Sequence, residues 1–262
     1  MNGRRIGGSR QYPHHSSAFA GDIVEVNLDV PNEQIFLSAK KTATLGTAQL
    51  RLFLYFKNMH EDELQNILSG TGHQEPANLI QTVAQKLGAG KKAGSTAEKN
   101  SVSKQREEKI LIAFADEHHL WKTDIDEDAF LAEGAEQKVY LCSDGKNVFK
   151  LNDTIFYTSW ADYFLSLQLH NYFFPGTLYT LTGFAKKDDV LYAVVEQPFI
   201  EFDAITNLEQ VKLFLQNNGF VWKKNNDFYH PGYQIILEDL HDENVLTSHD
   251  TLFFIDTVFY AL

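Results

Sequence analysis

Two pairs of strand-like segments with a single helix between them constrain the fold of this chain more than any other feature. The segments "QKVYLCS" and "NVFKLN" are separated by Asp144-Gly145, a dipeptide typical of a two-residue hairpin turn. A helix is expected from about Ser159 to Tyr172, because Ser159 or Thr158 can cap its start and Pro175 follows its end. Residues 177–200 form a second hairpin pattern around "KKDD". The sequence therefore predicts an α+β fold with a small antiparallel sheet.

Further elements are expected on both sides of this unit. Upstream, "QREEKILIAFADEHHLW" has the pattern of an amphipathic helix, with Ile110, Ile112, Ala113 and Leu120 among its buried positions. Downstream, a helix is expected between Asn207 and Gly219. It is followed by a hairpin or extended pair in "FVWKKNNDFYHPGYQIIL" and by the closing segments "LEDLHDENVL" and "TLFFIDTVFYAL". These elements would form a second, smaller part of the domain.

The first 104 residues have a different character. Residues 1–21 carry little to bury and are expected to be disordered. Residues 22–104 are expected to form a separate region of unknown function, with a strand pattern in "DIVEVNLDV", a helix or strand in "TAQLRLFLYFKNM", and two short helices closed by glycines in "EDELQNILSG" and "PANLIQTVAQKLG". The small, polar and cationic stretch 88–104 is typical of a flexible linker and lacks the spacing of a phosphate-binding loop. We therefore place a domain boundary at residue 105.

Composition limits the classes of partner. The 23 basic and 35 acidic side chains give a net charge of −12, which disfavours nucleic-acid binding through bulk charge and a broad attraction to anionic lipid. Cys142 is the one cysteine, so an intrachain disulfide and a cysteine-rich zinc site are excluded. No apolar run is long enough to span a bilayer. We expect a cytoplasmic protein with no membrane partner.

The polar residues of "LEDLHDENVL" have the spacing of a catalytic motif. Asp239 and Asn244 form Asp-x-x-x-x-Asn, and the next apolar segment delivers Asp256 in "FFIDT". This pattern resembles the catalytic loop of protein kinases and aminoglycoside phosphotransferases, followed by their metal-binding aspartate. Phosphoryl transfer uses one carboxylate to orient the acceptor hydroxyl, and an amide oxygen and a second carboxylate to hold Mg²⁺. The alternative is that the stretch is a solvated acidic turn.

Upstream positions match the other half of such a site. Lys150 lies on a strand between Phe149 and Leu151, as the phosphate-contacting lysine of a kinase does. Counting back from Val139 on the Gly-x-Gly-x-x-Gly-x-Val template places the three glycine positions at Ala132, Gly134 and Gln137, so that only Gly134 is kept.

A hinge and a wider resemblance complete the assignment. "EQPFI" follows the last strand of the predicted sheet, where the backbone of Glu196 and Gln197 would meet adenine. From about Gln105 onward the chain resembles the kinase domain found in polyvalent proteins of phages and conjugative elements. The segments that carry this resemblance are "EGAEQKVYL", "VFKLND", "FYTSWADYF", "LHNYFFP", "LTGF", "LYAVVEQPFI", "LEDLHDENVL" and "FFID".

The resemblance implies a protein-kinase-like fold over residues 105–262, with a small antiparallel N-lobe and a reduced C-lobe. It implies ATP and Mg²⁺ as cofactors and transfer of the γ-phosphate to a hydroxyl of a protein or small-molecule acceptor, in the host cytoplasm. Lys150 would contact the phosphates, Asp239 would be the catalytic base, and Asn244 and Asp256 would hold Mg²⁺. Gly134, Val139, Lys150, Glu196 and Gln197 would bind the nucleotide.

Several positions depart from the protein-kinase pattern. Glu238 precedes the predicted catalytic aspartate, where protein kinases usually carry arginine, and His241 stands where they carry lysine. These differences leave the class of acceptor open. Thr257 stands in place of the phenylalanine after the metal aspartate, and the few residues that follow leave no room in this sequence for an activation loop.

The partner of Lys150 and the activity itself are also left open by the sequence. A carboxylate partner for Lys150 is not evident: Asp162 is the acid of the following helix, while Gln168 is nearer the usual separation. His170 is expected to cap or to hydrogen-bond within the core. Three hypotheses follow, namely an active kinase, a pseudokinase that binds nucleotide without turnover, and an interaction protein.

Overall fold

The computed structural model describes residues 61–71, 78–88, 97–134 and 137–262, with side chains from residue 103 onward in the third range. The strand patterns expected in "DIVEVNLDV" and "TAQLRLFLYFKNM" and the disorder expected at 1–21 lie outside these residues. All described residues belong to one compact unit, Phe53–Leu262. None of the helices in these ranges is both long and apolar enough to cross a membrane.

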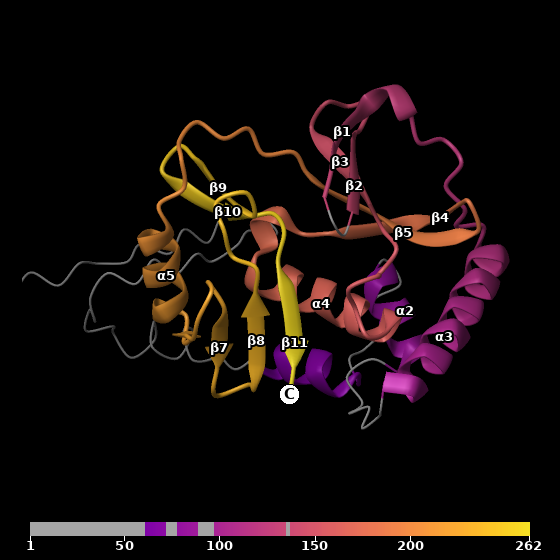
Figure 1. The fold of residues 1–262 in the computed structure, drawn as a ribbon, viewed down its shortest axis with the longest axis horizontal. Helices are drawn as coiled ribbons and strands as arrows, with labels where there is room; N and C mark the ends of the chain where they lie inside the picture. The colour runs from indigo at the N-terminus through magenta and orange to yellow at the C-terminus, as the bar shows by residue number, and fades with distance from the viewer. Residues whose placement is uncertain (1–60, 72–77, 89–96, 135–136) are drawn as a thin grey trace, which may run out of the picture. The chain divides into compact units, whose positions relative to one another are not determined.

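A five-stranded antiparallel sheet is the larger of the sheets (Figure 1). Its strands are β1 (Phe130–Glu133), β2 (Gln137–Leu141), β3 (Asn147–Asn152), β4 (Thr180–Lys187) and β5 (Val190–Pro198), in the order β1-β2-β3-β5-β4. The hairpins predicted at Asp144-Gly145 and at "KKDD" are confirmed: Gly145, Asp188 and Asp189 take positive φ values, as tight hairpin turns require. A short 3-10 helix, η1 (Glu127–Ala129), precedes the sheet.

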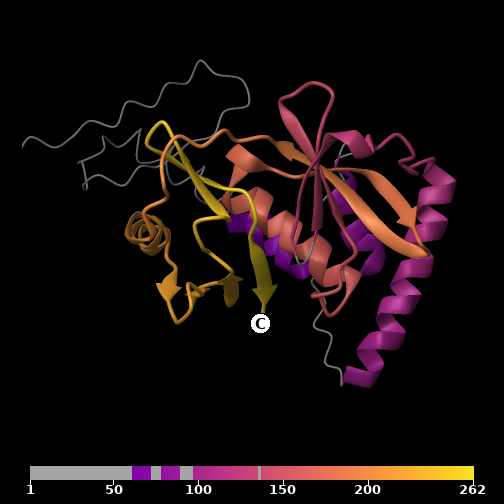
Figure 2. The ribbon, with the colours of Figure 1, turned by 45° about the horizontal axis from the view of Figure 1, so that its top comes forward.

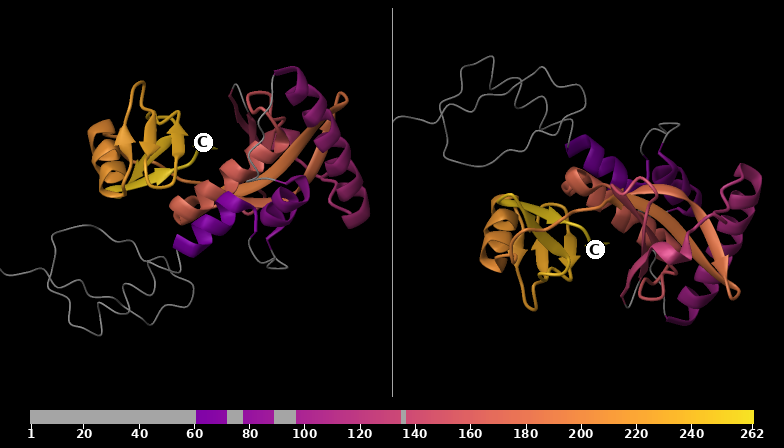
Figure 3. Two further views of the ribbon diagram at one scale, coloured as in Figure 1. Left: turned by 90° about the horizontal axis from the view of Figure 1, so that it is seen from below. Right: turned by 90° about the horizontal axis from the view of Figure 1, so that it is seen from above.

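Helix α4 (Trp160–Phe173) joins β3 to η2 (Pro175–Thr177) and β4. Ser159 caps it by accepting the N–H of Asp162 at 3.0 Å, as predicted. The helix is apolar on most of its surface because it is packed on several sides. Phe164 meets Phe184 of β4 with ring centroids 6.5 Å apart, and Ser166 Oγ accepts the N–H of Phe259 at 3.0 Å. Helix α4 therefore lies between the five-stranded sheet and the C-terminal strands (Figures 2 and 3).

The C-terminal part contains one helix and six strands. They are α5 (Leu208–Asn217), β6 (Val221–Trp222), β7 (Phe228–His230), β8 (Ile235–Glu238), β9 (Val245–Ser248), β10 (Thr251–Phe254) and β11 (Val258–Ala261). Four of the strands form an antiparallel sheet in the order β11-β8-β7-β6, and β9 pairs with β10 as a separate hairpin. Helix α5 begins after Asn207, as predicted, and the Asn207 side chain caps it. The connection from β10 to β11 returns the chain beside β8, and Asp256 lies on that connection.

Helix α3 (Ala97–His118) holds the start of α4 in place. Lys104 Nζ donates to the carbonyl oxygens of Thr154 and Tyr157, and Glu107 Oε2 accepts the N–H of Trp160 at 2.8 Å. The predicted buried set was wrong at one position, since Ala113 is exposed and Ile110, Ile112 and Leu120 are half-buried. The buried face instead contains Glu107, Leu111, Phe114 and Ala115. Glu107 is buried there because its carboxylate accepts the N–H of Trp160 at the start of α4.

The N-terminal helices share the same core. A helix over residues 61–69 and α2 (Leu79–Leu87) are each closed by a glycine with positive φ, Gly70 and Gly88, as predicted. Leu64, Ile80 and Val83 are buried in one cluster with the side chains of α4. The structure therefore places these helices on the domain that the sequence predicted to begin at residue 105, and α3 extends back to Ala97 within the predicted linker.

Gly183 allows the segment after α3 to approach β4. The N–H of Phe184 donates to Leu120 O at 2.8 Å, and the N–H of Lys122 donates to Phe184 O at 2.7 Å. Gly183 has φ +152°, and a Cβ on it would lie 2.2 Å from Leu120 O. A side chain at this position would force the two segments apart.

Candidate active site

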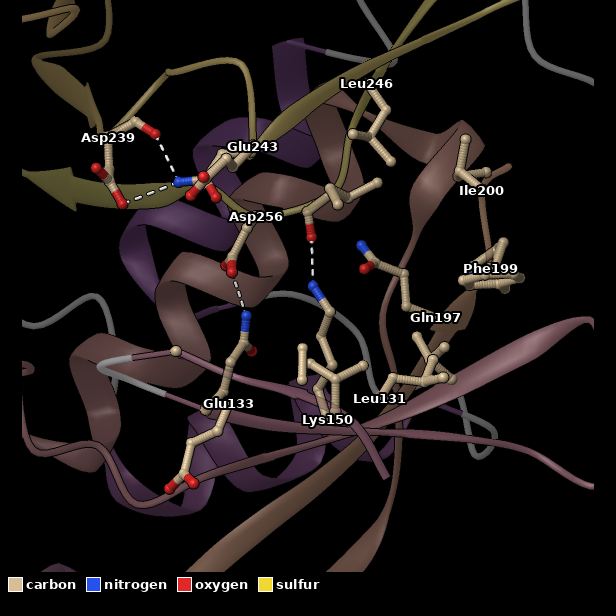
Figure 4. A pocket seen from close by; sticks show the side chains of 18 of the residues that line it. Leu131, Glu133, Lys150, Gln197, Phe199, Ile200, Asp239, Glu243, Leu246 and Asp256 are labelled. Atoms are coloured by element: carbon tan, nitrogen blue, oxygen red, sulfur yellow. Dashed lines mark hydrogen bonds between the residues drawn. The ribbon is translucent and has the colours of Figure 1, made fainter. Parts of the chain in front are cut away.

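A cavity of about 590 Å³ lies between the five-stranded sheet, the loop after β8 and the connection after β10 (Figure 4). This volume is within the range of small-molecule sites. The cavity lining includes Gln137, Lys150, Asp239, Asn244 and Asp256. Leu246, Phe199 and Ile200 lie together at an apolar end, while Asp239, Glu243 and Asp256 lie together at a polar end (Figure 4). Residues predicted from four separate segments of the sequence therefore face one cavity.

Lys150 enters the cavity from β3, whose alternation points its side chain away from solvent. The residue is 4% exposed, and Nζ donates to Ile255 O at 2.7 Å. The ammonium group also lies 5.5 Å from the centroid of the Tyr179 ring. Burial lowers the pKa of Lys150, and the carboxylate of Asp256 opposes that shift. Lys150 and Asp256, the residue predicted to bind metal, are separated by more than a hundred residues and are thus brought together.

The β9–β10 hairpin brings Asn244 and Asp256 together. Val245 pairs with Phe254, so the residue before β9 and those after β10 meet at the same end of the hairpin. Asn244 O accepts the N–H of Ile255 at 2.9 Å and that of Asp256 at 3.3 Å. Burial raises the pKa of the Asp256 carboxyl group, with Lys150 acting in the opposite direction. One short hairpin therefore brings together Asn244 and Asp256, the two residues whose spacing the sequence predicts to be functional.

Asp239 lies at the open end of the cavity. Its side chain is 57% exposed, and its φ of 65° places the residue in the left-handed region. Asn244 Nδ2 donates to Asp239 O at 2.8 Å and to Asp239 Oδ2 at 2.9 Å (Figure 4). His241 Nε2 lies 3.5 Å from Asp239 Oδ1. The carboxylate is oriented by its own loop and remains accessible to a molecule in solvent.

Gly134, which follows β1, and Gln137 and Val139 of β2 also line the cavity. The N–H of Gly134 donates to Gln137 O at 2.9 Å, which closes a tight turn. Gln137 Nε2 donates to Asp256 Oδ2 (Figure 4). Sequence reasoning treated Gln137 as a lost glycine and missed this contact, although a polar amide at a phosphate-facing position was a usable signal.

The two hinge residues differ in position. Gln197 is buried, lines the cavity, and donates from Nε2 to Thr177 O at 2.6 Å. Glu196 is half-buried on β5 and does not line the cavity. The N–H of Phe199 is already bonded to Lys146 O at 2.8 Å. The Phe199 N–H is therefore not free to bind a ligand in the cavity.

The oxygen donors suit a divalent cation bound together with phosphates. Asn244 Nδ2 is committed to Asp239, so the amide oxygen is the atom with which Asn244 could bind a cation. Asp256 supplies a carboxylate in a half-buried setting. In the described part of the chain no three histidine, cysteine or acidic side chains form a metal cage by themselves. Such a set fits Mg²⁺, which is commonly held by one or two protein ligands plus substrate phosphates.

Comparison with known families decides the assignment. Residues 104–262 match the model of the Serine/Threonine/Tyrosine Kinase found in polyvalent proteins, and this range is more than half of the chain. The chain belongs to this family. The polyvalent-protein kinase domain thus begins in α3, at the lysine that holds the β3–α4 turn. Searches of curated proteins and of solved structures gave no match.

Membership supports a kinase-like function for the domain. Lys150, Asp239, Asn244 and Asp256 all lie within the matched range and within the cavity. The polyvalent-protein kinase domain therefore contains a cavity with the residue types that phosphoryl transfer requires.

Proposed function

We propose that the chain is an ATP-dependent phosphotransferase that moves the γ-phosphoryl group of ATP to a hydroxyl acceptor. The observation that carries this proposal is the convergence of Lys150, Asp239, Asn244 and Asp256 on one cavity. Each of these residue types has a distinct use in phosphoryl transfer. The family match makes a kinase the first hypothesis for such a cavity.

The cavity suggests how the nucleotide would bind. The adenine base would occupy the apolar end, between Val139 and Val148 of the sheet and Leu246 of the C-terminal part. The triphosphate would extend toward Lys150, whose remaining N–H groups can donate to phosphate oxygens. Asn244 and Asp256 would hold Mg²⁺, which when bound neutralises charge on the phosphates.

Asp239 is placed for the acceptor. In the proposed reaction its carboxylate accepts the proton of the acceptor hydroxyl, the hydroxyl oxygen bonds to the γ-phosphorus, and the bond from that phosphorus to the bridging oxygen breaks to release ADP. Asn244 Nδ2 orients this carboxylate and keeps it at the open end. An exposed base suits an acceptor that arrives from solvent, whether a protein side chain or a small molecule.

The layout also supports a protein-kinase-like fold with two lobes. The five-stranded antiparallel sheet and α4 would be the N-lobe. Helix α5 and the C-terminal strands would be a reduced C-lobe, with the segment after β5 as the hinge between them. Origin in a phage or conjugative element, and thus a host cytoplasm as its compartment, stays a prediction.

A second candidate is a pseudokinase that binds nucleotide without turnover. The contact between Gln137 and Asp256 favours it, because the amide occupies an oxygen that a metal would need. The two candidates predict different products from the same incubation.

Label transfer from γ-labelled ATP tests the proposal. The full chain would be incubated with Mg²⁺ and γ-labelled ATP, alone and with a lysate and a panel of small hydroxyl acceptors. A kinase gives labelled product that is lost in Asp239→Asn, while a pseudokinase binds ATP and gives none. Absence of both binding and transfer would contradict the phosphotransferase proposal.

A further inference from the structure

The polyvalent-protein kinase domain has no carboxylate on α4 that reaches Lys150. Asp162 is the acid of that helix, and it lies at the first turn, where its charge acts on Glu107. The carboxylate that influences the pKa of Lys150 is that of Asp256. Among the described residues, neither Asp162 nor Gln168 makes a hydrogen bond or ion pair to the lysine. Some other group must therefore orient Lys150.

The carbonyl oxygen of Ile255 is the group that does so. It accepts from Lys150 Nζ at 2.7 Å and from Tyr179 Oη at 2.8 Å, which uses both of its lone pairs. The Tyr179 ring also faces the ammonium group. The position of Lys150 thus depends on the position of the segment 254–257.

That segment is fixed from behind by buried hydrogen bonds. Thr257 Oγ1 lies 2.7 Å from His170 Nδ1, and Thr177 Oγ1 donates to Phe254 O at 2.5 Å. His170 is fully buried, and its Nε2 lies 2.9 Å from Thr177 O. The hydroxyl of Thr257 therefore links the segment to α4 one residue after Asp256.

The chemistry of His170 gives each bond a direction. A carbonyl oxygen only accepts, so Nε2 carries the proton and donates to Thr177 O. Burial lowers the pKa of His170 to about 3, so the ring is neutral and Nδ1 is an acceptor. Thr257 Oγ1 must then donate to Nδ1. A valine at position 257 keeps the shape of threonine and removes this donor.

We propose that His170 is a positioning residue: through Thr257 and Thr177 it fixes the Phe254–Thr257 segment, whose Ile255 carbonyl orients Lys150 in place of a carboxylate on α4. Because Gln197 also donates to Thr177 O, the same buried bonds extend to the hinge end of the cavity. The inference concerns the nucleotide-binding site and so rests on the proposed function, although its effect on Lys150 exists without nucleotide.

Thr257→Val in the full chain is the test, with two readouts. The first is the rate at which an amine-acylating reagent modifies Lys150, measured by mass spectrometry with the exposed Lys186 as internal standard. The second is the affinity for a non-hydrolysable ATP analogue with and without Mg²⁺. Loss of one buried hydrogen bond is expected to raise Lys150 modification and to weaken Mg²⁺-dependent binding, each about tenfold. Binding without Mg²⁺ should weaken as well, because Lys150 would contact the phosphates directly.

Matched variants separate positioning from general destabilisation. Thr257→Ser keeps the hydroxyl and should restore both readouts. Thr182→Val removes a hydroxyl of β4 that donates to Val194 O of β5 at 3.0 Å and should change neither. Asp162→Asn and Gln168→Ala should also leave Lys150 modification unchanged.

Two results would overturn the inference. One is that Lys150 modification in Thr257→Val equals that of the wild type. The other is that Asp162→Asn or Gln168→Ala raises it as much as Thr257→Val does. Failure of the wild type to bind the analogue would instead count against the proposed function, because the modification readout needs no nucleotide.

Discussion

The two ends of the polar half of the cavity differ in how their functional groups are held. Lys150 is 4% exposed and bonded to a carbonyl of another segment, and the half-buried Asp256 lies close enough to affect its pKa. Asp239 is 57% exposed at its side chain, and Asn244 and His241 of its own loop contact its carboxylate. The end proposed for the nucleotide is therefore built by contacts between distant segments, while the end proposed for the acceptor is built within one loop.

This difference has electrostatic consequences. Burial lowers the pKa of Lys150 and raises that of Asp256, so both charges are costly without a ligand. A bound triphosphate with Mg²⁺ would offset both costs. Substitutions at the buried end should change nucleotide binding, and substitutions at the exposed end should change transfer.

Lys150→Met is expected to give the largest effect on binding. Methionine keeps an unbranched apolar chain and removes the ammonium group, and loss of charge-assisted hydrogen bonds to phosphate should weaken ATP-analogue binding about 100-fold. Asp256 loses its counter-charge in this variant, but burial already raises the pKa of its carboxyl group, so the carboxylate can take up a proton and the fold should persist. Calorimetric titration measures the affinity, and Lys146→Met on the same hairpin, where the lysine is exposed, is the control. Equal loss in both variants would break the comparison.

Gln137→Leu should strengthen Mg²⁺-dependent nucleotide binding, which is the opposite of the effect expected for Lys150→Met. The Gln137 amide donates to Asp256 Oδ2 and so competes with a cation for that oxygen. Leucine fills similar space without the amide, and we expect Mg²⁺-dependent nucleotide affinity to rise about tenfold. Titrations with Mg²⁺ at fixed analogue concentration measure this. A fall in Mg²⁺ affinity would show that the amide assists the metal instead.

Glu107→Gln should give the smallest effect and tests burial away from the cavity. Burial raises the pKa of Glu107, with the N–H groups of α4 opposing the shift. A raised folded pKa means that the wild type gains stability as pH falls through that value toward the unfolded pKa near 4.5. Glutamine should therefore be more stable than the wild type at pH 7, by up to about 1 kcal/mol, and this advantage should vanish below about pH 4. Thermal melts from pH 4 to 8 measure it, and a pH-independent difference would contradict the assignment.

The same contrast explains how much could be predicted from sequence. Hairpins at Asp144-Gly145 and "KKDD", the cap of α4 and the start of α5 were predicted correctly because turn and cap chemistry is local. Asp239, Asn244 and Asp256 were found together because one short hairpin separates them. Contacts between distant segments were missed, such as those from Gln137 to Asp256 and from His170 to Thr257. A local sequence pattern does not indicate which buried polar groups will form hydrogen bonds with one another.

Helix α3 also shows that burial depends on contacts with distant segments, which the sequence pattern of the helix does not indicate. A polar residue, Glu107, occupies a buried position there because the N-terminus of α4 lies against it. Periodicity alone assigned Ala113 to the core, and it is exposed. The docking of the N-terminal helices was likewise missed, since Leu64 and Ile80 become core residues only through contact with the rest of the domain.

The central claim is that Asp256 serves the nucleotide and Asp239 serves the acceptor. The most direct test is a titration of the wild type, Asp256→Asn and Asp239→Asn with a non-hydrolysable ATP analogue in the presence and absence of Mg²⁺. We predict that Asp239→Asn binds within about twofold of the wild type, while Asp256→Asn loses the Mg²⁺-dependent gain in affinity, tenfold or more by the strength of a charged ligand contact. Equal loss of the Mg²⁺-dependent gain in both variants, or its retention in both, would contradict this division of roles.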